Sequence, residues 1–346
     1  MEISVNLIYD FRSSTYHAVR YDDVTFFVAG SSWERRNVLK NPTFQSAQGV
    51  LYCFHHDEVT SLIMDTDMLY TTEVIEKNLL FVGGKTERNA FQLLDIPSQK
   101  VIRQQPDLVG GGCYCSLYLP AEKEVLVTTR KGFLQTIDAN TLSVKNSIQL
   151  APIGTRLWAV HYDPKESIVY ASDYEGSLHV IQKEGYKMLN KISLSELYHH
   201  RDNHDNLPSL WGLSYQNGCL IGGDRFGGIT IWDRDFKIQN HYRLLRNGSL
   251  ITDPAVRMLS SEVESVMSLA MIDDQHFIFG SRWGNVFLGD LQGNIQKILS
   301  VPMGVQKENS AFSMERIDSA YGVEVLVTFG DGQVYSLTYS KLTTQP

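Results

Sequence analysis

Residues 211–233, WGLSYQNGCLIGGDRFGGITIWD, decide the fold of this chain. Three short runs rich in apolar residues lie in this stretch, at 211–215, 219–221 and 228–232, and turns containing asparagine, aspartate and glycine separate them. Runs of this length that carry β-branched and aromatic residues and end near glycine are typical of buried strands. The stretch therefore predicts three consecutive short strands joined by tight turns.

The first of these runs belongs to a pattern that recurs along the whole chain. The pattern is a larger residue, a small residue, an aliphatic residue, any residue, and a large apolar residue. Copies occur roughly 43 to 56 residues apart, which is the period expected of propeller repeats. We interpret each copy as the first strand of one repeat, and the copies lie at 17–21, 60–64, 115–119, 158–162, 211–215, 267–271 and 312–316.

Each copy is followed by the same succession of features. A short apolar run comes next, then in most copies a turn with glycine, such as Gly132 or Gly284, and then a third and a fourth strand. Four-stranded units repeated in a ring are the blades of a propeller. We therefore predict an all-β fold, a seven-bladed β-propeller that forms a single domain over residues 1–346.

The two ends of the chain predict how the ring closes. The seventh unit has only three strands, which end near Tyr339, whereas a spare alternation of apolar and polar residues stands at 3–8, before the first unit. We expect this N-terminal strand to complete the last blade, because such closure removes the unpaired edge that an open array would leave.

The fifth unit carries a signature that resembles a known family. Trp232-Asp233 is similar to the dipeptide that names the WD-repeat proteins, and Asp173, Asp224 and Asp331 stand in the turn where that family often has aspartate. The resemblance covers nearly the whole chain, although only one unit keeps the Trp-Asp pair. It implies a WD40-like propeller that serves as a rigid platform for binding other macromolecules.

Composition and charge narrow the classes of function. A chain with 43% hydrophobic and 20% charged residues can bury a sizeable core. The formal net charge of −8 disfavours nucleic acid or an anionic membrane as the main partner, because both favour clustered Lys and Arg. No apolar run of about 18 residues occurs, and the four cysteines form no disulfide framework. We therefore expect a cytoplasmic or nuclear protein that binds other proteins, without direct nucleic-acid binding or membrane insertion.

The long irregular segments predict where partners bind. In the predicted blades, the turns between second and third strands and the connections between blades open on one face, which we call the upper face. The longest irregular segments all fall on it, and they are 31–48, 104–112, 195–209, 243–262 and 302–310. Tryptophan and arginine dominate the energetics of protein interfaces. We predict partner contacts at Trp33, Arg35, Arg36, His199, His200, Arg201, His204, Arg225 and Trp283.

One cluster in these segments has the composition of a metal site. His199, His200, Asp202, His204 and Asp205 offer the nitrogen and oxygen ligands that Zn²⁺ accepts. No zinc-site spacing or cysteine pair accompanies them, so a solvated loop is the favoured interpretation. We expect neither a metal nor a cofactor.

The chain also lacks the common catalytic motifs. Residues 83–86, Gly-Gly-Lys-Thr, are similar to the end of a phosphate-binding loop, but Leu79 stands where that motif needs glycine and no helix is expected to follow. The sequence contains no Gly-x-Ser-x-Gly and no His-Glu-x-x-His. We therefore predict a non-catalytic scaffold for protein–protein interaction, or a subunit of a multiprotein complex, with no catalytic residue to assign.

A second resemblance keeps an enzymatic alternative open. Gly30, an insertion, a strand at 49–54, and His204 before the fifth unit are similar in order to the WD-repeat diphthine methyl ester hydrolase family. This resemblance implies ester hydrolysis. Two features depart from it: Arg225 stands where that family usually has a second aspartate, and its glycine-rich last-blade motif is not evident near Phe312.

Overall fold

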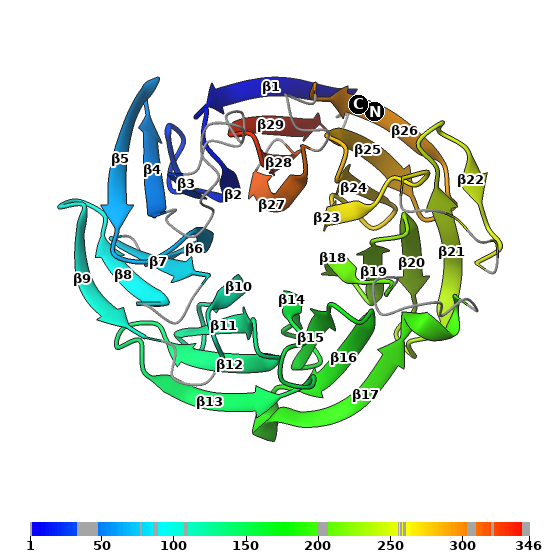
Figure 1. Cartoon of the computed structure of the whole chain (residues 1–346), viewed down its shortest axis with the longest axis horizontal. Coiled ribbons are helices and arrows are strands. Elements are labelled where there is room, and N and C mark those ends of the chain that lie inside the picture. The colour runs from blue at the N-terminus through cyan, green and yellow to red at the C-terminus, as the bar shows by residue number, and fades with distance from the viewer. Residues whose placement is uncertain are drawn as a thin grey trace, which may run out of the picture.

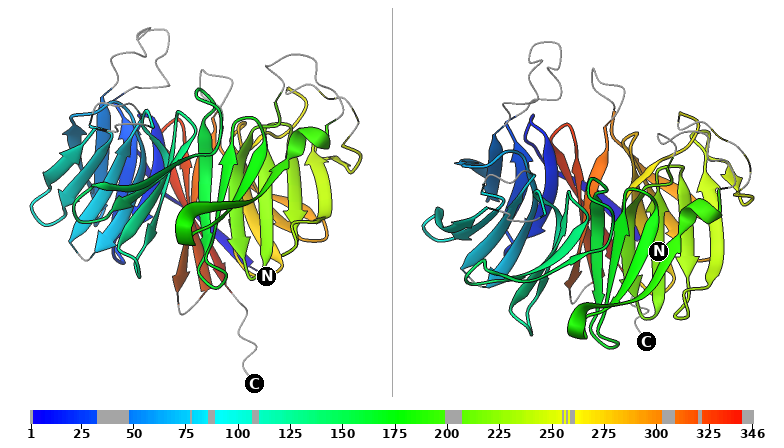
Figure 2. Two further views of the ribbon diagram at one scale, coloured as in Figure 1. Left: turned by 90° about the horizontal axis from the view of Figure 1, so that it is seen from below. Right: turned by 60° about the horizontal axis from the view of Figure 1, so that its bottom comes forward.

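The computed structural model describes residues 2–32, 48–76, 78–85, 89–106, 110–198, 207–254, 256, 258, 261–302, 309–319 and 322–340. These residues form seven antiparallel sheets arranged in a ring around a central channel (Figure 1). Each sheet is one blade, with one strand beside the channel and successive strands further out. Side views show the ring as a disc with the strands running between its two faces (Figure 2). The fold is the all-β, seven-bladed propeller that the repeats predict.

The first four blades follow one another along the chain. Blade 1 comprises β2 (Thr15–Arg20), β3 (Thr25–Ser31), β4 (Gly49–His55) and β5 (Glu58–Met64). Blade 2 comprises β6 (Leu69–Glu76), β7 (Leu79–Gly84), β8 (Phe91–Asp95) and β9 (Lys100–Gln105). Blade 3 comprises β10 (Cys113–Leu119), β11 (Glu124–Thr129), β12 (Phe133–Asp138) and β13 (Val144–Gln149). Blade 4 comprises β14 (Leu157–Asp163), β15 (Ile168–Asp173), β16 (Ser177–Gln182) and β17 (Lys187–Ser193).

The last three blades complete the ring. Blade 5 has a fifth strand on its outside and comprises β18 (Leu210–Gln216), β19 (Cys219–Asp224), β20 (Gly228–Trp232), β21 (Ile238–Leu244) and β22 (Leu250–Ile251). Blade 6 comprises β23 (Val266–Met271), β24 (His276–Ser281), β25 (Asn285–Asp290) and β26 (Ile295–Ser300). Blade 7 comprises β27 (Ala311–Ser319), β28 (Gly322–Phe329), β29 (Gln333–Ser340) and β1 (Glu2–Asp10).

The described residues outside the strands include two short 3-10 turns. They are η3 (Glu184–Tyr186) and η4 (Leu194–Glu196), and they stand at the two ends of β17. No helix in the described part of the chain is long and apolar enough to cross a membrane.

One predicted first strand is wrong. Residues 60–64 lie in β5, the outer strand of blade 1, and the strand of blade 2 that faces the channel is β6. The small-then-aliphatic order fits β5, but Ile63 in that strand is 64% exposed, as only a peripheral strand allows. Polar Thr71, Thr72 and Glu73 interrupt the apolar pattern of β6, so the sequence pattern did not identify β6 as a first strand. The other six predicted segments overlap β2, β10, β14, β18, β23 and β27.

The N-terminal strand closes the ring as predicted. β1 pairs antiparallel with β29, with Ile3 opposite Tyr339 and Val5 opposite Leu337. Blade 7 therefore contains strands from both ends of the sequence, and it has the same number of strands as most of the other blades. This pairing satisfies the edge of β29 that would otherwise be exposed.

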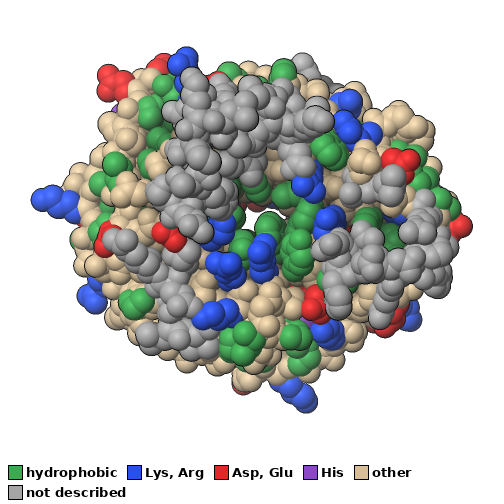
Figure 3. Space-filling view, viewed as in Figure 1, with side chains coloured by type: hydrophobic (Ala, Val, Ile, Leu, Met, Phe, Trp, Pro, Cys, Tyr) green, Lys and Arg blue, Asp and Glu red, His purple; other side chains and the backbone are tan. Residues whose placement is uncertain are grey.

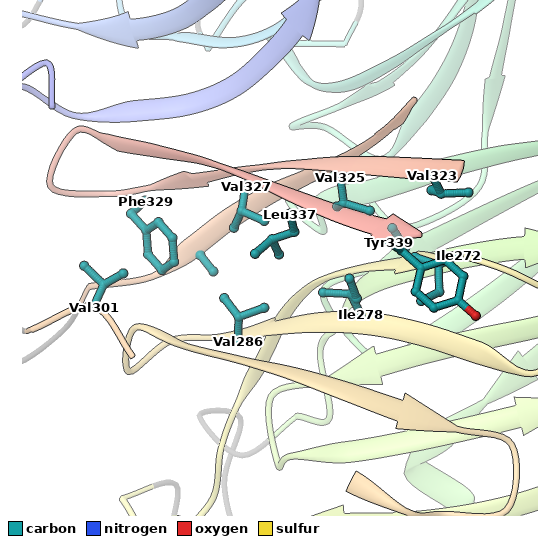
Figure 4. Packing of buried hydrophobic residues seen from close by; sticks show 12 residues of the cluster. Ile272, Ile278, Val286, Val301, Val323, Val325, Val327, Phe329, Leu337 and Tyr339 are labelled. Carbon is teal, nitrogen blue, oxygen red and sulfur yellow. The ribbon is translucent and has the colours of Figure 1, made fainter. Parts of the chain in front are cut away.

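The hydrophobic core lies between neighbouring blades. At the junction of blades 6 and 7, Ile278 and Val286 pack against Val325, Val327 and Leu337, and all five side chains are fully buried (Figure 4). Each such burial contributes about 1.5 to 3 kcal/mol relative to exposure. Because every blade is packed on two neighbours in this way, the ring presents its two faces as rigid surfaces.

Backbone hydrogen bonds fix which loops share a face. The amide of Lys85, in the turn after β7, donates to the carbonyl of Met68, in the connection between blades 1 and 2, at 2.9 Å. The amide of Arg225 makes the equivalent bond to Ser209 at 3.0 Å, and that of Arg282 to Ser265 at 2.9 Å. The turns between second and third strands and the connections between blades thus lie together on the upper face.

Candidate binding site at the upper mouth of the channel

A bulge at the start of each strand beside the channel places one large side chain at the upper mouth. In β18, for example, Leu210 pairs with Asp224 and Gly212 with Gly223, which leaves Trp211 unpaired between them. Equivalent register shifts occur in all seven of these strands. We call the resulting set the collar, and it comprises Tyr16, Tyr70, Tyr114, Trp158, Trp211, Met267 and Phe312.

The collar rings pack on one another around the channel. Tyr16 stacks on Tyr70 with ring centroids 4.6 Å apart, and Tyr114 stacks on Trp158 at 4.9 Å. Trp158 and Trp211 follow at 6.0 Å. Aromatic pairs of this kind stabilise a structure by about 0.5 to 1.5 kcal/mol beyond the area they bury. The collar is therefore a preformed apolar ring whose ring faces are largely covered by neighbouring rings.

Below the collar, a cavity of about 330 Å³ follows the channel. Its wall holds polar side chains as well as apolar ones, among them His17, Glu73, His161 and Glu315. Hydrogen bonds satisfy several of these groups: Ser116 donates to Glu73 at 2.9 Å, and the imidazole of His161 bonds to the backbone of Leu213 in the next blade.

Side-chain hydrogen bonds of this kind occur at six of the seven junctions between blades. Among the fully buried examples, the Met271 amide donates to Ser214 at 3.0 Å, and Ser268 donates to the Ala311 carbonyl at 2.8 Å. Thr15 donates to the carbonyl of Phe329, which ties blade 1 to blade 7. The other three of these junctions use the pairs Glu73 and Ser116, Thr128 and Trp158, and His161 and Leu213. The polar groups of the wall therefore hold the ring together.

Burial shifts the pKa values of these wall residues in the direction that favours their neutral forms. It lowers the pKa of His17 and of His161 to about 4, so both imidazoles are neutral at pH 7. Burial raises the pKa of Glu315 to about 7, and burial together with the Glu315 charge raises the pKa of Glu73 well above its usual value. The channel interior consequently carries little net charge.

Above the collar, basic side chains surround the mouth, and we call them the rim cations. Lys85 lies over the ring of Tyr70 at 5.5 Å, and Arg156 lies over Tyr114 at 5.9 Å. Figure 3 shows Lys and Arg side chains gathered around the central opening, with apolar side chains beside and within it. The rim cations stand on turns and connections of blades 2 to 6, and they are Lys85, Arg130, Arg156, Arg225 and Arg282.

Three rim cations have no acidic partner within the described ranges. None of the described carboxylates forms an ion pair or hydrogen bond with Arg130, Arg156 or Arg225, and the Nε of Arg225 has no acceptor among these residues. Three residues before Arg156 in the sequence, on the same connection between blades 3 and 4, the side chain of Ile153 is 74% exposed. An exposed aliphatic residue beside unpaired guanidinium groups is a composition typical of interface hot spots.

Two of the predicted contact residues fall within the described structure. Arg225 and Trp283 stand on the upper turns of the neighbouring blades 5 and 6. Trp283 is half-buried, its indole N–H donates to the Val263 carbonyl at 2.9 Å, and the guanidinium of Arg246 lies 4.3 Å from its ring. Trp283 therefore also holds the connection between the two blades.

The other predicted contact residues lie outside the described residues. They are Trp33, Arg35, Arg36, His199, His200, Arg201 and His204. The His/Asp cluster weighed as a zinc site lies there too, and no group of His, Cys, Asp or Glu within the described ranges could hold a metal ion.

Asp224, one of the turn aspartates of the WD-repeat resemblance and the residue before Arg225, has a structural role in the described geometry. One carboxylate oxygen accepts the amides of Phe226 and Gly228 at 2.7 and 2.9 Å, and the other accepts the hydroxyl of Tyr198 at 2.5 Å. Asp173 in blade 4 uses its carboxylate in the same way, and it also bonds to the buried ring of His179 at 2.9 Å. These aspartates fix the upper turns.

Cys115, which lines the channel, and Cys219, which packs against the core of blades 5 and 6, are poor nucleophiles. Burial raises the pKa of Cys115 to about 12 and that of Cys219 to about 11. Such thiols stay protonated at neutral pH, and the thiolate is the reactive form. They pack as small apolar residues.

Sequence reasoning missed the collar, although a signal was present. The recurring pattern includes the collar residue as its first position in four units, where Trp158, Trp211, Met267 and Phe312 stand. In units 1 and 3 the collar residue precedes the pattern by one position, and in unit 2 the wrong strand was chosen, so Tyr70 was not considered. A search for a large apolar residue one or two positions before each small one would have found six of the seven collar residues.

Comparison with known proteins agrees with this architecture. No protein-family model and no curated protein matches the sequence. Among solved structures, the chain is similar to the WD40 β-propeller domain of Doa1, with a TM-score of 0.66 over 98% of this chain and 96% of that one. The sequence identity is 13%, so the likeness concerns the fold alone. The chain thus has the fold of a WD40-like seven-bladed propeller.

Proposed function

We propose that this chain is a non-catalytic scaffold for protein–protein interaction, or a subunit of a multiprotein complex, that binds its partner on the upper face around the channel mouth. The observation that carries the proposal is the mouth itself, where arginines without an acidic partner among the described residues stand on the turns above a preformed apolar collar. A surface held rigid by the blades loses little conformational entropy on association.

The lower face offers a useful contrast to this composition. Its turns between third and fourth strands are held by aspartates that cap their own loops: Asp138 accepts the amides of Asn140 and Thr141, and Asp290 accepts those of Gln292 and Asn294. Asp173 and Asp224 cap upper turns in the same way, so the aspartates do not distinguish the two faces. The contrast lies in the collar and the rim cations, which make the upper face the favoured docking side.

A cytoplasmic or nuclear location is part of the proposal. None of the four cysteines, all of which lie in the described ranges, forms a disulfide, and Cys53, Cys115 and Cys219 are partly accessible. Unpaired thiols persist in reducing compartments.

The test is a quantitative pull-down from the native source at physiological salt, with matched variants of the two faces. The upper variant is Ile153→Ser with Arg225→Ala, and the lower variant is Ile238→Ser with Arg234→Ala. We expect the wild type and the lower variant to recover the same partners. The upper variant should recover at least about fivefold less, because interface anchors cost 1 kcal/mol or more each.

Two outcomes would contradict the proposal. One is a folded wild-type chain that recovers no protein above the empty tag. The other is equal loss of partners in the upper and lower variants. A further variant, Trp33→Ala with Arg35→Ala and Arg36→Ala, checks the sequence-based part of the proposal, and we expect it to weaken recovery as well.

A further inference from the structure

We propose that the channel mouth binds an acidic peptide segment of the partner, whose Asp and Glu side chains pair with Arg130, Arg156 and Arg225. This inference rests on the proposed function and names the chemistry of the ligand. The surface concerned is the arc of the mouth over blades 3 to 5, between the collar and the rim.

The backbone holds the three arginines in place. The Arg130 amide donates to the Gly112 carbonyl at 3.2 Å, the Arg225 amide donates to Ser209 at 3.0 Å, and the Arg156 carbonyl accepts the amide of Tyr174 at 2.9 Å. Each residue therefore sits on a turn that is bonded to its neighbour. The guanidinium groups project from a fixed frame, which favours binding of a ligand with complementary spacing.

The charge of these groups is not neutralised within the described structure. Arg156 contacts the rings of Tyr114 and Tyr174, and the described residues supply no carboxylate to Arg130, Arg156 or Arg225. A guanidinium presents a planar fork of donors that matches a carboxylate, and such bonds are stronger than neutral ones. The acceptors that the described residues do not supply are those that aspartate and glutamate side chains carry.

The net charge of the chain favours binding of an acidic segment at the mouth over binding elsewhere on the surface. The chain carries a formal charge of −8, so its surface as a whole repels an acidic segment. Blades 2 to 6 nevertheless place five basic residues around the mouth. An acidic segment is therefore attracted to this arc and repelled elsewhere, which increases its association rate and sets its position.

The collar geometry favours a peptide over single-stranded nucleic acid. Binding of unpaired bases depends on aromatic faces that are free for stacking. Here the faces of Tyr16 and Tyr70 cover each other, and so do those of Tyr114 and Trp158. Arg156 lies over another face of Tyr114. The mouth thus offers cations and apolar ring edges, which suit carboxylate and aliphatic side chains.

The experiment selects peptides on the full-length chain. A phage-displayed library of random 12-residue peptides is enriched on the wild type and on a charge-reversed variant, Arg130→Glu with Arg156→Glu and Arg225→Glu. A matched variant, Lys100→Glu with Lys165→Glu and Lys187→Glu, makes the same change in net charge with exposed residues of the lower face. Thermal unfolding of all three proteins confirms that they are folded.

We expect the wild type and the lower-face variant to enrich the same acidic peptides, and the mouth variant to lose them. The affinity of the best peptide, measured by fluorescence anisotropy, should fall at least about 100-fold in the mouth variant, because three attractive charge pairs become repulsive. Its affinity for the lower-face variant should stay within about threefold of wild type. Arg→Ala changes at the same three positions should give an intermediate loss.

Several results would overturn the inference. Neutral or basic peptides enriched on the wild type, no enrichment at all, or acidic peptides retained by the mouth variant would each do so. Tighter binding of a 12-nucleotide oligouridylate than of the best peptide, lost in the same variant, would assign the mouth to nucleic acid. A pull-down partner that depends on the upper face but carries no acidic segment would leave the proposed function standing and refute the acidic ligand.

Discussion

The mouth of the channel and the wall beneath it are formed by the same seven strands and the turns attached to them, but their polar groups are used differently. In the wall, Ser214 and Ser268 bond across blade junctions, and His161 does the same while remaining neutral. At the mouth, Arg130 and Arg225 find no acidic partner among the described residues. The wall uses these polar groups in bonds within the protein, whereas the mouth leaves charge for another molecule.

This difference separates residues that hold the fold from residues that are available for binding. Leaving a buried polar group without a partner costs about 1 to 3 kcal/mol, so the wall must pair its groups for the ring to close. A charged group at the solvent boundary has no such requirement. Substitutions in the wall should therefore lower stability, and substitutions at the mouth should lower affinity.

The sharpest test compares two adjacent residues of one upper turn. Asp224→Ala should lower the free energy of unfolding by about 3 kcal/mol, because it removes the acceptor of two backbone amides and of the Tyr198 hydroxyl in a buried site. Arg225→Ala should change it by less than about 0.5 kcal/mol, since its side chain makes no such bonds. Urea unfolding measures both. Equal losses in the two variants would remove the distinction between wall and mouth.

A smaller and pH-dependent effect is expected at His161. The unfolded chain protonates this residue near pH 6.5, whereas burial lowers its pKa in the native state to about 4. The unfolded state therefore binds the extra proton between these values, and the contribution of His161 to stability is lost as the pH falls from 6.5 to 4.

The measurement compares the wild type with His161→Gln, whose amide keeps a donor for the neighbouring backbone. The stability difference between them should shift against the wild type by at most about 1.4 kcal/mol per pH unit across this window. Comparing the two proteins cancels the opposite contributions of Glu315 and Asp224, whose pKa values burial raises to about 7 and about 6. A difference that stays constant from pH 7.5 to 4.5 would mean that His161 titrates normally.

The smallest expected effect concerns a single bond across a blade junction. Ser214→Ala should cost about 1 kcal/mol, because the buried amide of Met271 loses its acceptor. The matched change at the mouth, Arg130→Ala, should leave the unfolding midpoint in urea unchanged. If Ser214→Ala had no effect while Arg130→Ala destabilised the protein, the two regions would have exchanged roles.

Much of the blade architecture could be predicted from the sequence because it depends on local patterns. The apolar runs such as residues 79–82 and 325–327 are buried second strands, and the glycine turns follow them. The error at 60–64 arose because an exposed outer strand and a strand beside the channel carry the same small-then-aliphatic order. Which of the two is buried depends on the neighbouring blades, and these are distant in the sequence.

The candidate site was less predictable for a similar reason. Arg225 and Trp283 were predicted from residue type and loop position, and they do stand on the upper face. Trp158 and Trp211 were seen only as strand residues, because each looks like an ordinary core aromatic. They become part of a collar only in the folded ring, where seven strand bulges place side chains from Tyr16 to Phe312 side by side at the mouth.

The sequence by itself determined the number of blades and the closing role of residues 3–8, because strand periodicity and turn residues are local properties. The tertiary structure alone decided which polar groups are paired. Ser116 pairs with Glu73 of the neighbouring blade, and Thr15 pairs with the Phe329 carbonyl across the closed ring, whereas the guanidinium of Arg156 lies over Tyr114 without a carboxylate in reach among the described residues. Pairing depends on distances between segments far apart in the chain, and only the closure of the ring fixes those distances.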